Sequence, residues 1–163
     1  THGADECVDG CRLFAALLLK ALGGVAKDDI TSPDPWPPGM DGINAPIMSP
    51  HLQAIAAALY RHKTVDQIHG RGYVVDSLEA ALWCFEHTAD YRSAVLAAAN
   101  LGDDADTTAA VCGQLAGAYY GVQGIPTMLF VRDGQIVDRI VGAVPYPVIK
   151  GRVDKILAAQ VTA

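Results

Sequence analysis

The hydrophobic pattern of this chain changes its period near residue 121. Up to that point, apolar residues recur every three or four positions, which predicts a series of helices. Beyond Pro126, TMLFV and QIVDRIVG are short runs rich in β-branched residues, and Arg132-Asp133-Gly134 between them carries an Asp-Gly turn signal. The pattern therefore predicts many helices first and a β-hairpin afterwards.

The predicted helices can be placed from their apolar spacing and their capping residues. Gly23-Gly24 ends the first helix, and the stretch 31–50 holds six prolines and predicts a surface loop. Thr64 is expected to cap a short helix, Ser77 to cap LEAALWCFEH, and Asp90 to open YRSAVLAAAN. The other helices are expected at 7–22, 51–62, from about 104–107 to about 120, and around Ile149, Val153, Ile156 and Leu157.

These elements predict a mainly α chain that is α+β overall, because a hairpin and a terminal helix follow the helical part. We expect a helical region over 1–121 and a β-β-α segment over 122–163, packed as one compact domain. A chain of 163 residues with 51% hydrophobic residues is large enough for such a core.

Charge and composition exclude several classes of partner. The formal net charge is −6, and Lys and Arg are scattered, so we expect neither nucleic acid nor an anionic membrane as a partner. The apolar stretch 13–22 is too short to span a bilayer, which predicts a soluble, cytoplasmic protein. Four cysteines form no C-x-x-C pair, and Cys7 and Cys11 are expected in the core with Phe14 and Leu18.

The segment Gly102-Asp-Asp-Ala-Asp-Thr-Thr108 is the most informative for chemistry. Two carboxylates, Asp104 and Asp106, stand two residues apart with the Thr107 hydroxyl beside them. Magnesium prefers several oxygen ligands of this kind. Helix capping is the alternative role, because Asp and Thr are favoured at helix N-termini. The segment alone leaves both roles open.

The surrounding sequence resembles the ADP-ribosylglycohydrolase family. The resemblance rests on GRGYVVDSLEAALWCF at 70–85 and AVLAAANLGDDADTTAAVCGQLAGAYYG at 94–121, and it extends to Thr1-His2 and to IAAALYRHKTVDQIHG before Gly70. It covers about residues 1–124. It implies an all-α fold, two magnesium ions and cleavage of the glycosidic bond that joins ADP-ribose to an acceptor.

The same resemblance implies roles for individual residues. Asp104, Asp106 and Thr107 become candidate magnesium ligands. A second set is expected to hold an ADP-ribose-like ligand, and it consists of Gly70, Gly72, Tyr73 and His2. Glycine would let backbone amides approach the ligand, and Tyr73 would offer a ring face.

Part of the family's apparatus is not expected in this chain. The remaining metal ligands, a Thr-Asp-Asp cluster, and the catalytic carboxylate belong to a half that precedes the Thr-His motif in the family. This sequence shows no such half, so we expect an incomplete active site and assign no catalytic residue.

The ending of the chain resembles a different family. YGVQGIPTMLFVRDGQIVDRIVGAVPYPVIKGRVDKILA, over about 120–163, is similar to the C-terminal segment of thioredoxins. That resemblance implies a cis peptide at Pro126. The thioredoxin part with the C-x-x-C pair is missing, so no disulfide exchange is expected. The chain is thus interpreted as a chimera of two family segments.

Two functional hypotheses follow. The first is a hybrid or truncated ADP-ribosylglycohydrolase-like hydrolase that binds magnesium or an ADP-ribose-like molecule through a partial site. The alternative is a non-catalytic chimera that self-associates. Both predict a homodimer, because a half-domain exposes apolar helix faces that a partner would cover. A redox role for Cys7 and Cys11 ranks last.

Overall fold

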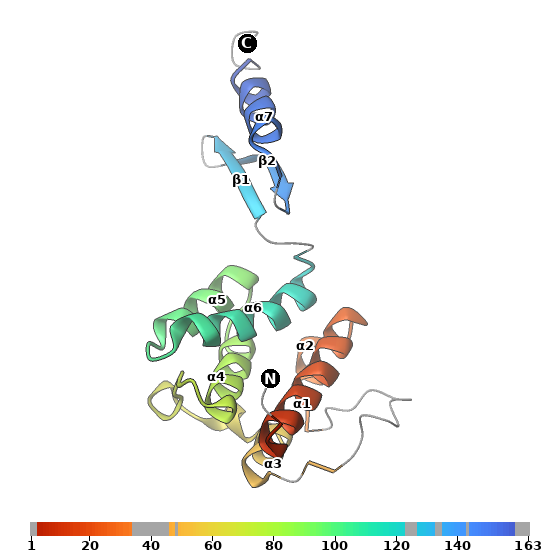
Figure 1. The fold of residues 1–163 in the computed structure, drawn as a ribbon, viewed down its shortest axis with the longest axis vertical. Coiled ribbons are helices and arrows are strands. Elements are labelled where there is room, and N and C mark those ends of the chain that lie inside the picture. Colours follow the sequence, from red (N-terminus) through yellow and green to blue (C-terminus); the bar gives the residue numbers. More distant parts are fainter. Residues whose placement is uncertain are drawn as a thin grey trace. The chain divides into compact units, whose positions relative to one another are not determined.

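The computed structural model describes residues 3–33, 46–47, 49–122, 127–132, 135–142 and 144–158 (Figure 1). The chain divides into two compact units, unit 1 (Thr1–Gly121) and unit 2 (Val122–Ala163). Each unit is described by itself below. The expectation that both regions pack as one compact domain stays a prediction.

Unit 1 is built from helices joined by short connections. Their bounds are α1 (Asp5–Leu22), α2 (Lys27–Ile30), α3 (Pro50–Ala56), the 3-10 turns η1 (Leu59–His62) and η2 (Val65–Gln67), α4 (Val74–Glu86), α5 (Tyr91–Asn100) and α6 (Ala105–Tyr120). The prediction of a mainly α chain is confirmed. Thr64 forms the expected capping box before η2, and the Asp90 carboxylate accepts from the Ser93 amide at the start of α5.

The core of unit 1 lies where α1, α4 and α6 pack together, with α5 against α6. Its largest fully buried side chains include Tyr60, Phe85, Leu13, Ile30, Leu52, Leu82 and Leu115. A Cβ at Gly113 would lie 3.5 Å from Val95 Cγ2, which is an ordinary van der Waals contact, so the packing of α5 on α6 does not require glycine there.

Three details of the helices differ from the predictions. Helix α4 begins at Val74, so Ser77 lies inside it and donates to the Val74 carbonyl instead of capping. The predicted helix 51–62 is broken at Ala58, whose φ of 56° is left-handed, and it continues as η1. Helix α1 buries Leu13 and Leu17 and leaves Cys11 exposed, so the expected core position of Cys11 is wrong.

A polar network closes the end of α4 against α2 and η1. The Arg61 guanidinium pairs with Glu86 at 2.8 Å, and both contact Thr31, which accepts from Arg61 at 2.7 Å and donates to Glu86 at 2.5 Å. Nearby, the Lys27 ammonium lies 4.8 Å from the centre of the Phe85 ring and donates to the Thr88 carbonyl. Burial lowers the pKa of Lys27.

Unit 2 contains an antiparallel hairpin and one helix. Strand β1 (Thr127–Arg132) pairs with β2 (Gln135–Val141), with a register shift between Phe130 and Val131, and α7 (Tyr146–Ala158) follows. The predicted hairpin and terminal helix are confirmed, while Asp133 and Gly134 of the predicted turn lie outside the described residues. Arg152 on α7 donates to Asp138 on β2 at 2.9 Å and ties the helix to the hairpin.

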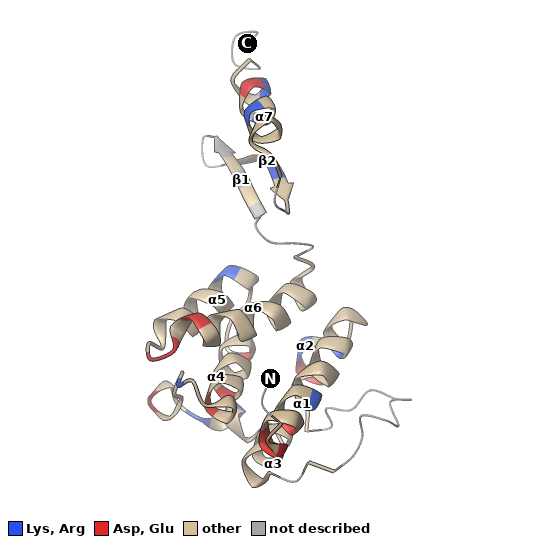
Figure 2. Cartoon of the chain, in the orientation of Figure 1, with Lys and Arg blue, Asp and Glu red and all other residues tan. Residues whose placement is uncertain are grey.

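The charged residues follow the sequence expectation of scattered cations. Figure 2 shows Lys and Arg on separate helices of unit 1, without a continuous basic stripe among the described residues. No helix in the described part of the chain combines the length and the hydropathy that crossing a membrane requires.

Candidate functional site

The glycine loop before α4 packs directly on the acidic loop before α6. The Asp104 amide donates to the Gly70 carbonyl at 2.7 Å. A Cβ on Gly70 would lie 3.1 Å from the Gly102 carbonyl oxygen, and one on Gly72 would lie 2.8 Å from Asp104 Oδ2. Only a residue without a Cβ permits this approach without displacement. Two predicted motifs about thirty positions apart in the sequence therefore meet.

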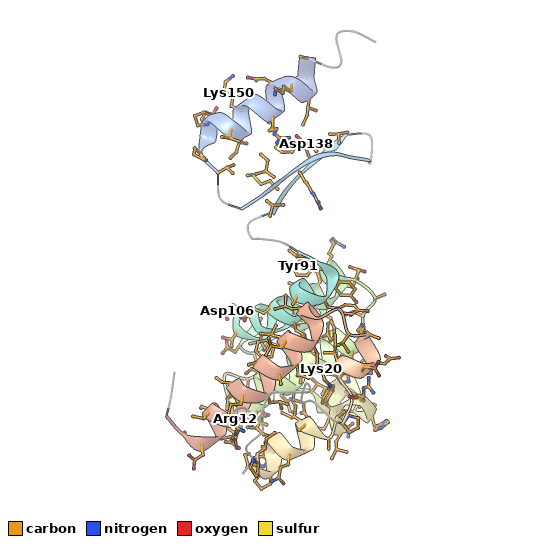
Figure 3. The ribbon with its side chains drawn as sticks, turned by 90° about the vertical axis from the view of Figure 1, so that its right-hand side faces the viewer. Arg12, Lys20, Tyr91, Asp106, Asp138 and Lys150 are labelled. Atoms are coloured by element: carbon orange, nitrogen blue, oxygen red, sulfur yellow. The ribbon has the colours of Figure 1, made fainter. Side chains whose placement is uncertain are left out.

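Asp104 is the centre of the acidic loop. Its side chain lies within hydrogen-bonding reach of the side chains of Thr107 and Asp106, and these contacts lower the pKa of Asp104. The preceding Asp103 has a left-handed φ of 52°, which turns the chain sharply into α6. Asp104, Asp106 and Thr107 thus form one oxygen-rich cluster, with Asp106 labelled at the start of α6 in Figure 3.

An open groove of about 700 Å³ borders this cluster. It is lined from α1 by residues such as Glu6, Cys11 and Arg12, from the start of α4 by Gly72 and Tyr73, and from α6 by Thr107. Its walls are mainly apolar, with a few polar groups, as is usual for small-molecule sites. Arg12, labelled on α1 in Figure 3, is paired with Asp9 at 2.8 Å.

Three helices begin at this groove, and two of them have no side-chain cap. The N-cap residues of α1 and α4 are Ala4 and Tyr73, and neither accepts a cap hydrogen bond through its side chain, whereas the Asp104 carboxylate at the start of α6 interacts with the Thr107 amide. Helix α3, whose N-cap Ser49 also donates to Glu6 of the groove, and helix α5 have side-chain caps, Ser49 and Asp90. Uncapped amides and helix dipoles at a shared groove favour an anionic ligand.

Tyr73 lies at the groove, and 44% of the residue is exposed. Its hydroxyl donates to Glu6, whose carboxylate also accepts from Ser49 Oγ at 2.6 Å. The hydrogen bond to Glu6 raises the pKa of Tyr73 to about 12. The hydrogen bonds from Ser49 and then Tyr73 lower the pKa of Glu6.

The residues present fit part of a magnesium site. Two carboxylates beside a hydroxyl are the donor set that a hard cation prefers. Within the described ranges, no group of three or more His, Cys, Asp or Glu side chains forms a metal cluster. A magnesium ion held by this cluster would take its other ligands from water or from other groups.

Several site residues could not have been found from the sequence. Glu6 and Arg12 line the groove, but in the sequence they read as ordinary helix residues. Thr108 is fully buried, and in the described structure its hydroxyl has no partner. Of the predicted residues, Gly72, Tyr73 and Thr107 line the groove, and Gly70, Asp104 and Asp106 adjoin it. His2 and Pro126 lie outside the described residues.

The end of the chain is similar to thioredoxins over a short stretch. A thioredoxin of Synechococcus elongatus is 47% identical over 36 residues, which is 22% of this chain and 34% of that one. A match of this length does not confirm a fusion. The proposed chimera therefore stays a prediction.

The similarity to ADP-ribosylglycohydrolases covers many more residues. The sequence profile of the ADP-ribosylglycohydrolase family matches residues 1–146 and so extends beyond the expected limit near 124. An ADP-ribosylarginine hydrolase of Pseudomonas putida is 46% identical over 126 residues, or 77% of this chain and 31% of the relative.

A solved structure described as an ADP-ribosylglycohydrolase-related protein complex shares the fold. It has a TM-score of 0.62 and 37% identity, over 77% of this chain and 41% of that one. The chain thus spans about a third of the length of the curated relative. With the family profile matching most of its residues, this chain belongs to the ADP-ribosylglycohydrolase family.

Proposed function

We propose that this chain binds magnesium and the ADP-ribose group in the groove between α1, α4 and α6, as one part of an ADP-ribosylglycohydrolase site. The observation that carries the proposal is the contact between the glycine loop and the acidic loop. In this contact the Asp104 amide donates to the Gly70 carbonyl. This contact sets a candidate metal cluster beside a groove of ligand size.

The chemistry of the groove suits each part of ADP-ribose. The uncapped starts of α1 and α4 suit the diphosphate, because free amides and the positive ends of helix dipoles attract phosphate. The exposed ring of Tyr73 offers a flat surface to the base or the ribose. Asp104, Asp106 and Thr107 would hold magnesium, which when bound orients hydroxyl groups and polarises water.

Hydrolysis needs more groups than these. Metal-assisted cleavage requires an acid or base matched to the leaving group, and in the described residues the carboxylates near the groove are already engaged. We therefore propose that this chain alone binds without efficient turnover, and that the remaining ligands come from other residues or another chain. The name of the Pseudomonas putida relative points to ADP-ribosylated arginine as the acceptor class.

Calorimetric titration with ADP-ribose tests this function. Saturable heat is expected in the presence of magnesium, and much weaker heat is expected when a chelator removes the metal. A titration without heat under both conditions would contradict the proposal.

Self-association is the second candidate function, and one face of α1 favours it. Val8, Leu19 and Leu22 share that face by helical spacing and are 45%, 39% and 70% exposed. Arg12 lies on the same face between Val8 and Leu19, and Val8 also lines the groove, so the face is not continuously apolar. A second copy of the chain can supply the same exposed apolar residues through a two-fold axis and cover them.

Light scattering tests the proposed homodimer. The wild-type chain at micromolar concentration is expected to have twice the monomer mass of 17.1 kDa. Replacing Val8 and Leu22 by lysine should give the monomer mass, while replacing the exposed Val65 on η2 by lysine should not. A wild-type chain that is strictly monomeric would contradict the homodimer.

A further inference from the structure

We infer that Glu6 is a positioning residue that fixes the Tyr73 ring as a wall of the groove. The inference rests on the proposed function for its ligand and on the hydrogen bonds of Glu6 for its geometry. Glu6 lies in the first turn of α1, a segment that the family resemblance did not single out.

Three side chains from two other parts of unit 1 converge on the Glu6 carboxylate. Ser49 Oγ, at the N-cap of α3, donates to Oε1 at 2.6 Å, and His51 Nδ1 lies 3.4 Å from the same oxygen. The Tyr73 hydroxyl, at the start of α4, donates to Oε2. One carboxylate therefore joins α1, α3 and α4 at the mouth of the groove.

This arrangement acts on the ring and not on the core. Glu6 keeps 28% of its side chain exposed, and Tyr73 is not among the buried residues. A hydroxyl bound to a carboxylate is held more strongly than one bound to a neutral group. The carboxylate thus limits the rotation of a ring that would otherwise be mobile at a surface, and a preorganised wall binds its ligand better.

Asp76 and Cys7 are the other titratable groups that act on the Tyr73 phenol, and both affect it less than Glu6 does. The ring is therefore controlled mainly through one contact. We therefore expect the effect of replacing Glu6 on ligand affinity to depend on whether the Tyr73 hydroxyl is present. A general structural role of Glu6 would show no such dependence.

A double-mutant cycle on ADP-ribose affinity at saturating magnesium tests the inference. Glu6→Ala and Tyr73→Phe should each weaken binding by roughly five-fold, the size expected for one hydrogen bond, and the double variant should be no weaker than either one. Glu6→Gln keeps a neutral acceptor and should lie between wild type and Glu6→Ala. Magnesium affinity should stay unchanged in all variants.

Two outcomes of the cycle would overturn the inference. One is unchanged ADP-ribose affinity in Glu6→Ala. The other is an equal loss from Glu6→Ala in the wild-type and Tyr73→Phe backgrounds, since Glu6 would then act without the hydroxyl.

A spectroscopic measurement without ligand tests the contact between Glu6 and Tyr73 independently of the proposed function. The Tyr73 phenol, with its pKa raised to about 12, should stay largely protonated at about pH 11, and Glu6→Ala should let it ionise there. The change is measured as tyrosinate absorbance, with Tyr73→Phe as the reference. If wild type binds no ADP-ribose but this shift appears, the proposed function fails and the anchoring of Tyr73 stands; if the shift is absent, the anchoring fails.

Discussion

Replacing Phe85 by alanine should lower the free energy of unfolding of unit 1 by about 3–5 kcal/mol. Phe85 is fully buried in α4, and its ring packs edge-on against Tyr119 at 5.6 Å and Tyr120 at 6.3 Å between ring centroids. Truncation leaves a cavity at the junction of α4 with the end of α6. It also removes the ring over which Lys27 lies.

Urea unfolding followed by tryptophan fluorescence measures this loss. Both tryptophans, Trp36 and Trp83, belong to residues 1–121, so the signal reports on unit 1. Leu59→Ala is the matched control, because Leu59 is 56% exposed and lies outside the proposed dimer face, so it should change stability by no more than about 0.5 kcal/mol. Equal effects from the two substitutions would show that the core does not lie beneath α4.

Replacing Asp104 and Asp106 together by alanine should abolish magnesium binding. The pair supplies both carboxylates of the cluster, and the Thr107 hydroxyl alone is a weak ligand for a hard cation. The fold should persist, because the Asp104 backbone accepts from the Thr108 amide at 3.1 Å and donates to the Gly70 carbonyl at 2.7 Å, and alanine keeps both bonds. If the double variant still binds magnesium, the metal binds elsewhere and the proposal that this cluster holds it is wrong.

Calorimetric titration with magnesium measures this effect. A matched control is the double variant Asp66→Ala with Asp154→Ala, which removes two charges from exposed positions outside the groove. It should bind magnesium like wild type. A similar loss in this control would show that the net charge of the chain, and not the cluster, governs the measured heat.

The sequence predicted most helices because their signals are local. Asp90 and Thr64 cap their helices as expected, since capping depends on neighbouring residues only. The prediction for Ser77 was wrong because α4 begins one turn earlier, at Val74, in spite of the low helix propensity of valine. Tyr73, at the groove, takes the N-cap position without a polar side-chain cap.

The burial of α1 could not be predicted from periodicity. One stripe runs through Cys7, Cys11 and Phe14, and another through Leu13, Leu17 and Ala21, so the helix is apolar on nearly all sides. The structure buries the second stripe and turns Cys11 to the groove. Only tertiary packing distinguishes the two faces.

The site residues that belong to a sequence motif could be predicted. Those that join the site only through contacts between distant segments could not. Asp104, Asp106 and the glycine loop came from a resemblance, and their contact through Gly70 gives that resemblance a physical basis. The role of Glu6 depends on partners at positions 49, 51 and 73, which come together only in the folded chain. In unit 2, the apolar residues of α7 lack a buried face among the described residues, because two strands offer too little surface to cover them.

The most direct test of the central claim is the affinity of this chain for ADP-ribose, measured by calorimetry with magnesium present and after chelation. A groove that joins the glycine loop to the acidic cluster predicts one site per chain, at least about ten-fold tighter with magnesium and lost when Asp104 and Asp106 are replaced by alanine. Binding of equal strength with and without the metal, or no binding at all, would contradict the account.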